Sequence, residues 1–318
     1  MRDSISRVPE GAIRYNTDSN KMEVWIGDKW MQVSVSAAGV AGGRGVFTSR
    51  YTPSNNDVLD YIKISSGGTA VDFGNVTSSR SHSSTGSSRT RGIIMGGATP
   101  SMLNSVEQIE IASTSNATDF GDLTVARRRP QSLSNSTRGV HVAGSDVSPA
   151  PYLNVIDYNT IASAGNSIDF GDTDATTLSH GGSVASSTRG IYSVAYEAPA
   201  YSNAIEFITI ATTGNGQDFG DLSAAKGYHF RGSICDTTRG LFAGGYNPAQ
   251  NTIDFVTMAS AGNASDFGDL TVARRSGAGT ANSIHSIFAG GYLPGVNNTI
   301  DRVLIQTTGN AVDFGDFV

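Results

Sequence analysis

Six copies of the tripeptide Asp-Phe-Gly carry the side chains that could most readily do chemistry in this chain of 318 residues. A carboxylate beside a glycine can bind a cation, serve in acid–base chemistry or accept hydrogen bonds from turn amides. The copies recur at intervals of 47, 50, 49, 48 and 47 residues. Their phenylalanines are Phe73, Phe120, Phe170, Phe219, Phe267 and Phe314. Such a regular interval indicates a structural repeat, so we expect the motif to build the fold.

Catalytic alternatives for these motifs lack the residues that they would need. Asp-Phe-Gly is also the magnesium-binding motif of protein kinases, but no glycine-rich phosphate loop accompanies the six copies. The Asp-x-Gly fragment resembles the Asp-box of sialidase propellers, yet the Ser, Thr and Trp of that motif are missing. Cys235 is the single cysteine, and the histidines (His82, His141, His180, His229 and His285) lack metal-ligand spacing. We therefore expect no catalytic residue, metal or cofactor, and a protein that is not an enzyme.

The elements that carry the motif are predicted to be strands. In the fifth copy, strand-like segments at 232–238, 239–246, 252–260 and 265–275 are separated by residues typical of turns. Four short strands in about 48 residues match one blade of a β-propeller. Six copies predict an all-β, six-bladed propeller in which the first and last blades close the ring. Each phenylalanine, the one large residue present in every copy, is expected to be a wedge between neighbouring blades.

An acidic residue follows an aliphatic one in the third strand of every copy. These residues are Asp60, Glu107, Asp157, Glu206, Asp254 and Asp301. Five second strands begin with an arginine, namely Arg44, Arg91, Arg138, Arg189 and Arg239. We expect the acid of the third strand and the arginine of the second to form a buried, repeated polar contact.

The charge balance limits the classes of partner. A formal net charge of −6 and a pI near 5.3 argue against nucleic acid. The run Arg127-Arg128-Arg129 is a local exception, which we interpret as a solvated turn. No stretch is apolar enough for membrane insertion, and the N-terminus has no apolar segment of a secretory signal. Synthesis in a cytoplasm is the expectation.

The repeats resemble the kelch repeat, whose blades run from an arginine through an aliphatic strand ending in Gly-Gly to a fourth strand carrying tryptophan. The match covers residues 33–318, which we take as the propeller domain. Here phenylalanine replaces the kelch tryptophan in every copy, and both tryptophans, Trp25 and Trp30, precede the repeats. The resemblance supports the kelch-like propeller and implies no particular kelch partner.

Residues 1–32 are predicted to be a separate segment for attachment or oligomerisation. Within 10–33, two or three short strands form a meander too small to be stable alone, so it must dock on something. The string resembles a short module of bacteriophage tail-fibre and other virion proteins. The matching positions are Gly11, Tyr15, Asn16, Thr17, Asn20, Lys21, Gly27 and Trp30. The repeats likewise resemble kelch-type arrays in structural proteins of marine phages. This resemblance implies a virion appendage protein, made in the host cytoplasm and located on the particle.

The loops between second and third strands are the predicted place for a ligand, because blades hold variable loops on a rigid frame. The candidate contact residues are Tyr51, Tyr152, Tyr201, Tyr246, Asn247, Tyr292 and Asn297. The predicted function is host-surface recognition, of a glycan or a protein, or decoration. The expected partners are other virion proteins through the N-terminal segment and further copies of the chain. A structural connector without a ligand and a glycan-cleaving propeller remain the alternatives.

Overall fold

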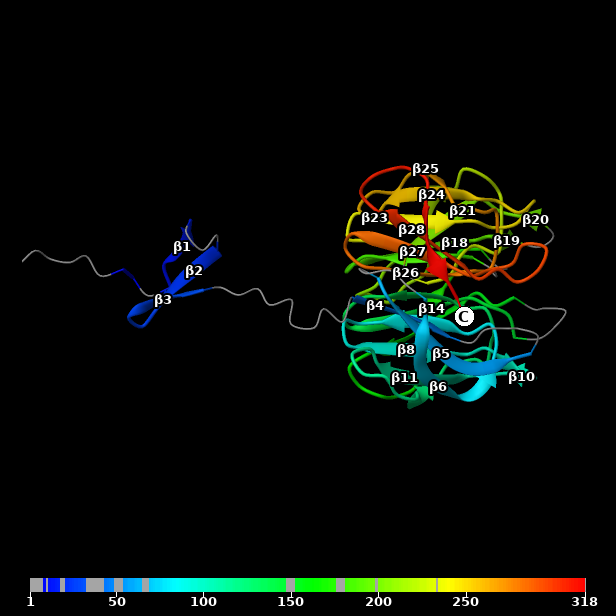
Figure 1. Ribbon diagram of the computed structural model, residues 1–318. Helices are drawn as coiled ribbons and strands as arrows, with labels where there is room; N and C mark the ends of the chain where they lie inside the picture. The colour runs from blue at the N-terminus through cyan, green and yellow to red at the C-terminus, as the bar shows by residue number, and fades with distance from the viewer. Residues whose placement is uncertain are drawn as a thin grey trace, which may run out of the picture. The chain divides into compact units, whose positions relative to one another are not determined.

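The computed structural model shows two units of all-β structure, spanning residues 1–40 and 41–318 (Figure 1). The described residues are 8–9, 11–17, 21–32, 43–48, 54–64, 69–146, 152–175, 181–197, 200–232 and 234–317. Among them, no helix has the length and apolar character that crossing a membrane requires.

The N-terminal unit is a three-stranded antiparallel meander with two chemically different faces. Its strands are β1 (Ile13–Asn16), β2 (Lys21–Ile26) and β3 (Lys29–Gln32), in that order. On one face, Trp25 and Trp30 meet edge to face with centroids 5.3 Å apart, and Arg14 lies 4.2 Å from the Trp30 ring. The strand register places Ile13, Tyr15, Met22, Val24 and Met31 together on the other face. That face is apolar and largely exposed.

The second unit is a β-propeller of six antiparallel blades, as the repeat predicts. Blade 1 is β4 (Arg44–Thr48), β5 (Asn56–Lys63) and β6 (Val71–Arg80). Blade 2 is β7 (Ser84–Ser87), β8 (Arg91–Met95), β11 (Ser105–Glu110) and β12 (Thr118–Asp122). Blade 3 is β13 (Gln131–Ser134), β14 (Arg138–Val142), β15 (Val155–Thr160) and β16 (Ile168–Asp172).

The remaining blades follow the same order. Blade 4 is β17 (Ser183–Ala185), β18 (Arg189–Ser193), β21 (Ala204–Thr209) and β22 (Gln217–Asp221). Blade 5 is β23 (Arg239–Ala243), β24 (Thr252–Thr257) and β25 (Ser265–Asp269). Blade 6 is β26 (Ala278–Ala281), β27 (His285–Ala289), β28 (Thr299–Leu304) and β29 (Val312–Asp316). Two small hairpins, β9 (Ala98–Thr99) with β10 (Ser101–Met102) and β19 (Tyr196–Glu197) with β20 (Ala200–Tyr201), lie between second and third strands.

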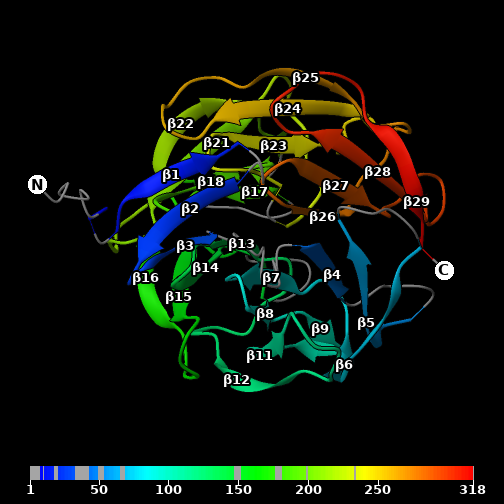
Figure 2. The ribbon, with the colours of Figure 1, turned by 60° about the vertical axis from the view of Figure 1, so that its left-hand side comes forward.

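The blades surround a central axis on which the inner strands meet. Strand β13 contacts both β7 and β17, and β26 of blade 6 contacts β4 of blade 1. Figure 2 shows these inner strands near the centre of the ring, with β12, β22, β25 and β29 at the rim. One apolar cluster fills each of the six boundaries between blades. The last boundary packs Ile300 and Ile287 of blade 6 against Ile62 of blade 1, which closes the ring.

The phenylalanine of each Asp-Phe-Gly motif lies in one of these clusters. Phe170 of blade 3, for example, packs in the cluster that contains Ile208 and Ile210 of blade 4. The first five phenylalanines are at most 2% exposed, and Phe314 is half-buried at the closing boundary. The predicted wedge is therefore confirmed. Removing such a ring is expected to cost about 3–5 kcal/mol.

The glycine of the motif lets the next blade approach. At Gly171, φ is 146°, and a Cβ would lie 2.6 Å from the carbonyl oxygen of Gly214 in blade 4. The following amide, that of Asp172, donates to Asn215 Oδ1 at 3.1 Å. The same bond to an asparagine of the next blade's turn recurs at Asn116, Asn166, Asn263 and Asn310. Motif and turn thus form a backbone latch between blades, because only glycine fits the approach and the φ angle.

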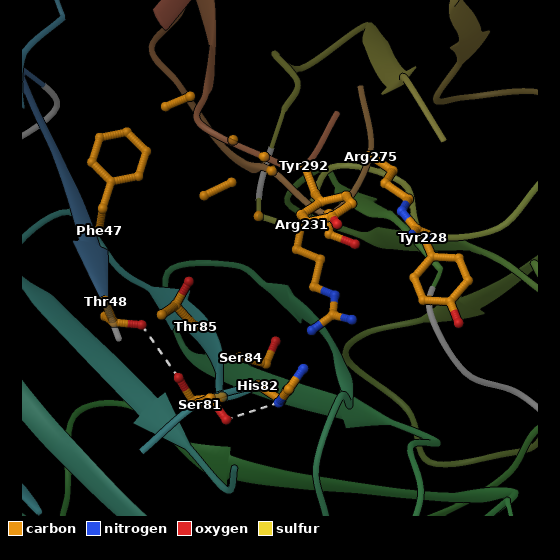
Figure 3. A pocket seen from close by; sticks show the side chains of 18 of the residues that line it. Phe47, Thr48, Ser81, His82, Ser84, Thr85, Tyr228, Arg231, Arg275 and Tyr292 are labelled. Carbon is orange, nitrogen blue, oxygen red and sulfur yellow. Dashed lines mark hydrogen bonds between the residues drawn. The ribbon is translucent and has the colours of Figure 1, made fainter. Parts of the chain in front are cut away.

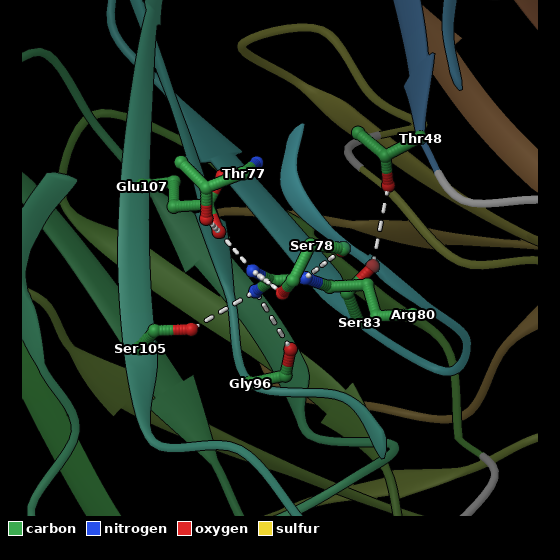
Figure 4. Close-up of polar contacts among 8 residues, drawn as sticks. All are labelled: Thr48, Thr77, Ser78, Arg80, Ser83, Gly96, Ser105 and Glu107. Carbon is green, nitrogen blue, oxygen red and sulfur yellow. Dashed lines mark hydrogen bonds and ion pairs between the residues drawn. The ribbon is translucent and has the colours of Figure 1, made fainter. Parts of the chain in front are cut away.

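Five of the third-strand acids are paired with a residue other than the predicted arginine. Their partners lie seven residues after the Asp-Phe-Gly phenylalanine of the preceding blade. The ion pairs are Glu107–Arg80, Asp157–Arg127, Asp254–Lys226 and Asp301–Arg274. In blade 4, Glu206 instead accepts a hydrogen bond from Tyr192 Oη at 2.7 Å. Figure 4 shows Arg80 held by Glu107, Ser105, Ser78 and the Gly96 carbonyl.

Two expectations about arginine are therefore wrong. Arg127 is fully buried and ion-paired, so it is not part of a solvated turn. Among the described residues, the second-strand arginines of blades 2 to 5 are not the partners of these acids; Arg138 donates to the Ile210 carbonyl of the next blade at 2.9 Å and stacks on Tyr158 at 4.4 Å. Equivalent bonds to the next blade are made by Arg44, Arg91, Arg189 and Arg239. Both sets of cations tie one blade to its neighbour.

Candidate ligand-binding site

A cavity of about 400 Å³ lies beside the inner strands of blades 1, 2 and 6. Its walls come from Val46–Thr48 of β4, from 81–85 leading into β7, and from 275–279 leading into β26. Tyr292 and Asn297, between the second and third strands of blade 6, complete one side. No Asp or Glu occurs among the described residues that line it. Serine, threonine, tyrosine and arginine supply the polar atoms.

The crossovers, the segments that connect the last strand of one blade to the first strand of the next, place residues with left-handed backbone conformations at this cavity. Nine residues after the motif phenylalanine, His82, Arg129, Tyr228 and Ser276 adopt left-handed φ angles of 57–60°. A non-glycine residue there costs of order 1 kcal/mol or more, and such strain is concentrated at functional sites. Hydrogen bonds hold the turns in place: the Arg129 amide donates to the His82 carbonyl at 2.8 Å, and the Ser276 amide to that of Tyr228 at 2.7 Å. All four residues line the cavity.

Arg231 reaches the cavity because blade 5 begins irregularly. The Arg231 amide donates to the Gly277 carbonyl at 3.0 Å, and Arg231 bridges to Ala278 of β26 in blade 6. Gly232, with φ at 113°, then redirects the chain. Figure 3 shows the guanidinium pointing into the space between Ser84, His82 and Tyr228. Among the described residues, no side chain or carbonyl forms a hydrogen bond or ion pair with it.

The cavity has a positive electrostatic environment. Burial, together with the charge of Arg129, lowers the pKa of Arg231 to about 10, so Arg231 stays protonated near neutral pH. Burial and the charges of Arg129, Arg231 and Arg128 lower the pKa of His82 to about 3. Arginine can only donate, so Arg129 Nη2 donates to His82 Nε2 at 3.3 Å. The proton of neutral His82 is then on Nδ1, which faces Ser81 Oγ at 2.9 Å.

Tyrosines form a continuous aromatic chain beside the cavity, here called the tyrosine belt. It runs through ring contacts of 5.4–6.5 Å and ends on Arg275, whose guanidinium carbon lies 4.3–5.2 Å from three of the rings. Its members are Tyr152, Tyr196, Tyr201, Tyr228, Tyr246 and Tyr292. Tyr246 and Tyr292 are 40% and 46% exposed. The belt therefore offers ring surface from blades 3 to 6 to a ligand.

Five of the seven predicted loop residues lie in the tyrosine belt or at the cavity. Tyr152, Tyr201, Tyr246 and Tyr292 belong to the tyrosine belt, and Asn297 lines the cavity. Asn247 instead precedes a cis proline and donates from Nδ2 to the Ala225 carbonyl at 3.3 Å, so it holds its own loop. Tyr51 lies outside the described residues.

Sequence reasoning missed other residues of the site. Tyr196, Tyr228, Arg231 and Arg275 were not singled out, nor was the crossover position of His82. One signal was available: Arg231 stands twelve residues after the motif phenylalanine, where other copies have the small residues Thr85, Ser132, Gly182 and Gly279. The crossover position gives no such signal, because its residue type differs from copy to copy.

His141, His229 and Cys235 form hydrogen bonds within the propeller. His141 and His229 are fully buried, with ring nitrogens on Asn159 Oδ1 at 2.8 Å and Ser193 Oγ at 3.1 Å. Cys235 Sγ donates to the Ala185 carbonyl at 3.0 Å. His180 lies outside the described residues. Within the described parts of the chain, no group of three or more His, Cys, Asp or Glu is placed to hold a metal ion.

Fold and site together define a six-bladed β-propeller with a cationic, tyrosine-rich cavity beside its crossovers. Solved structures share this fold. One of them, described as the structure of YjhT, superposes with a TM-score of 0.60 over 77% of this chain and 88% of that chain. The identity is 8%, so the likeness concerns the fold alone. No protein-family model matches the chain, and neither does any curated protein.

Proposed function

We propose that the propeller is a non-enzymatic recognition module that binds a saccharide on a host surface, as part of a virion appendage. The observation that carries this proposal is the tyrosine belt beside the 400 Å³ cavity. Aromatic rings with a polar tip suit sugars, because the ring packs on C–H faces while the hydroxyl bonds sugar hydroxyls. The cavity volume falls within the usual range for small-molecule sites. The virion context rests on the resemblance of residues 10–33 to the tail-fibre module.

The N-terminal meander supports the proposed place in a virion appendage, because its exposed apolar face is suited to the assembly of several copies of the chain. Ile13, Tyr15, Met22 and Met31 share one face and are 43–65% exposed. A three-stranded sheet this small needs a cover for its apolar face to be stable. We infer that a second copy of the same face supplies the cover. Several propellers on one particle would then convert weak contacts into firm attachment.

Light scattering on the full chain tests the assembly. We expect an oligomer for the unmodified chain, and a monomer after Tyr15→Ser combined with Met22→Ser. The matched control, Val312→Ser together with Ile168→Ser, removes exposed apolar side chains from outer strands of the propeller and should leave the oligomer intact. A monomeric unmodified chain would contradict the inference about the N-terminal face.

A glycan array combined with host-cell adsorption tests recognition. The full chain should bind a subset of glycans, and Tyr246→Ser should weaken both binding and adsorption. Ile168→Ser, at a 58% exposed position on an outer strand, is the control that should change neither. Absence of glycan binding with normal particle assembly would favour the connector alternative. Cleavage of a bound glycan would favour the enzyme alternative.

A further inference from the structure

Arg231 is half-buried, and unlike the fully buried cations of the propeller it has no counter-charge among the described residues. Arg80, Arg127, Lys226 and Arg274 each meet a carboxylate. The described residues that line the cavity with Arg231 include no carboxylate. A cation that is partly removed from water without an anion is unfavourable unless something else pairs with it. The geometry therefore leaves a place for a negative group inside the cavity.

The surrounding groups increase the preference for an anion. Arg129 and Arg275 also line the cavity, and neither forms an ion pair among the described residues. Arg275 is held between rings of the tyrosine belt, and Arg129 is held by His82. His82 is neutral near pH 7 because burial and nearby arginines lower its pKa to about 3. The titratable groups that face Arg231 are therefore cationic or neutral.

We propose that this cavity binds an acidic sugar through its carboxylate or sulfate group, with Arg231 as the central contact. The planar guanidinium fork matches two oxygens of either group. Ser81, Ser84 and Thr85 line the same cavity and supply hydroxyls for the remaining oxygens; Ser84 lies beside the guanidinium in Figure 3. Tyr228 and Tyr292 flank the opposite side, where the sugar ring would lie. This inference rests on the proposed saccharide recognition and specifies its ligand class.

The first test compares charged glycans with their neutral counterparts on the full chain. Bound glycans should carry carboxylates or sulfates, and methyl esterification or desulfation should weaken binding at least tenfold. Arg231→Met should remove most of that difference while leaving the neutral counterpart's affinity unchanged. Arg231→Lys keeps the positive charge but lacks the planar guanidinium, so it should lose part of the affinity difference between acidic and neutral glycans. Arg89→Met, which removes an exposed arginine outside the cavity, is the charge-matched control and should behave as the unmodified chain. The carboxylated and sulfated arms show which of the two groups is preferred.

A second readout uses small probes and needs no preferred glycan. Free glucuronate should raise the melting temperature more than glucose does, and Arg231→Met should abolish the difference. Binding of neutral glycans as tightly as acidic ones would overturn the inference while leaving saccharide recognition standing. A charge preference that survives Arg231→Met would also overturn it. Failure of every glycan and of glucuronate would contradict both the inference and the proposed function.

Discussion

Arg127 and Arg129 are two residues apart on one crossover, and their environments are opposite. Arg127 is buried between blades 2 and 3 and pairs with Asp157. Arg129, turned by its left-handed φ of 57°, faces the cavity with no carboxylate partner among the described residues. Arg274 and Arg275 show the same contrast, since the first pairs with Asp301 and the second stacks on tyrosines. The cations paired with a carboxylate hold the blades together, whereas Arg129 and Arg275, which have no carboxylate among the described residues and line the cavity, are available to a ligand.

The largest expected effect comes from breaking an internal pair. Asp157→Ala leaves the Arg127 guanidinium buried without its carboxylate, and Thr124 loses the acceptor of its hydroxyl. We expect a loss of about 3–5 kcal/mol in the free energy of unfolding. Urea unfolding of the full chain measures it. Asp169→Ala, which removes an exposed carboxylate from the same blade, is the control. Equal stability of the two variants would show that the pair does not hold the blades.

The backbone latch should come next. Gly171→Ala places a methyl group 2.6 Å from the Gly214 carbonyl oxygen at a φ of 146°. The strained backbone alone costs about 1–3 kcal/mol. Gly214→Ala is the matched control on the other side of the latch, because a Cβ there meets nothing within 4 Å. Thermal melts should therefore show a clear loss for the first variant and little for the second. If both variants melt alike, the close approach of the blades is not the reason for this glycine.

Protonation of the buried histidines below neutral pH is expected to have a smaller effect on the free energy of unfolding. Burial lowers the pKa of His141 to about 4, and burial with the charge of Lys226 lowers that of His229 to about 3. The unfolded chain binds these protons near pH 6.5 while the folded chain does not, so stability falls as pH drops below 6.5. Each histidine steepens that fall by up to about 1.4 kcal/mol per pH unit.

Stability curves from pH 7.5 to 4.5 check this expectation. His229→Gln should flatten the curve below pH 6.5, because the position no longer titrates. His285→Gln, at a half-buried position, should change the slope less. A His229→Gln curve that runs parallel to that of the unmodified chain would rule out the buried neutral histidine as a cause of acid sensitivity.

The sequence predicted the features that recur in every copy, but it did not predict the residues at which single copies depart from the repeat. The six regularly spaced phenylalanines were enough to predict the strand order, the number of blades and the position of each phenylalanine between two blades. The predicted partner was wrong for Glu107, Asp157, Asp254 and Asp301 because each ion pair crosses a blade boundary, whereas the arginine within the same copy is nearer along the chain. The cavity depends on ring closure, which brings Phe47, His82, Arg231 and Tyr292 together from four distant places. The irregular start of blade 5, which positions Arg231, follows no pattern shared with the other copies.

The most direct test of the distinction between paired and unpaired cations compares Arg127→Met with Arg231→Met in one experiment. Melting temperatures of the full chain are measured with and without glucuronate, since a ligand that binds the folded state raises the melting temperature. We expect Arg127→Met to lower the melting temperature and keep the glucuronate response. Arg231→Met should keep or raise the melting temperature and lose the response. The opposite pattern, with Arg231→Met unstable and still responsive, would contradict the assignment of Arg231 to a ligand.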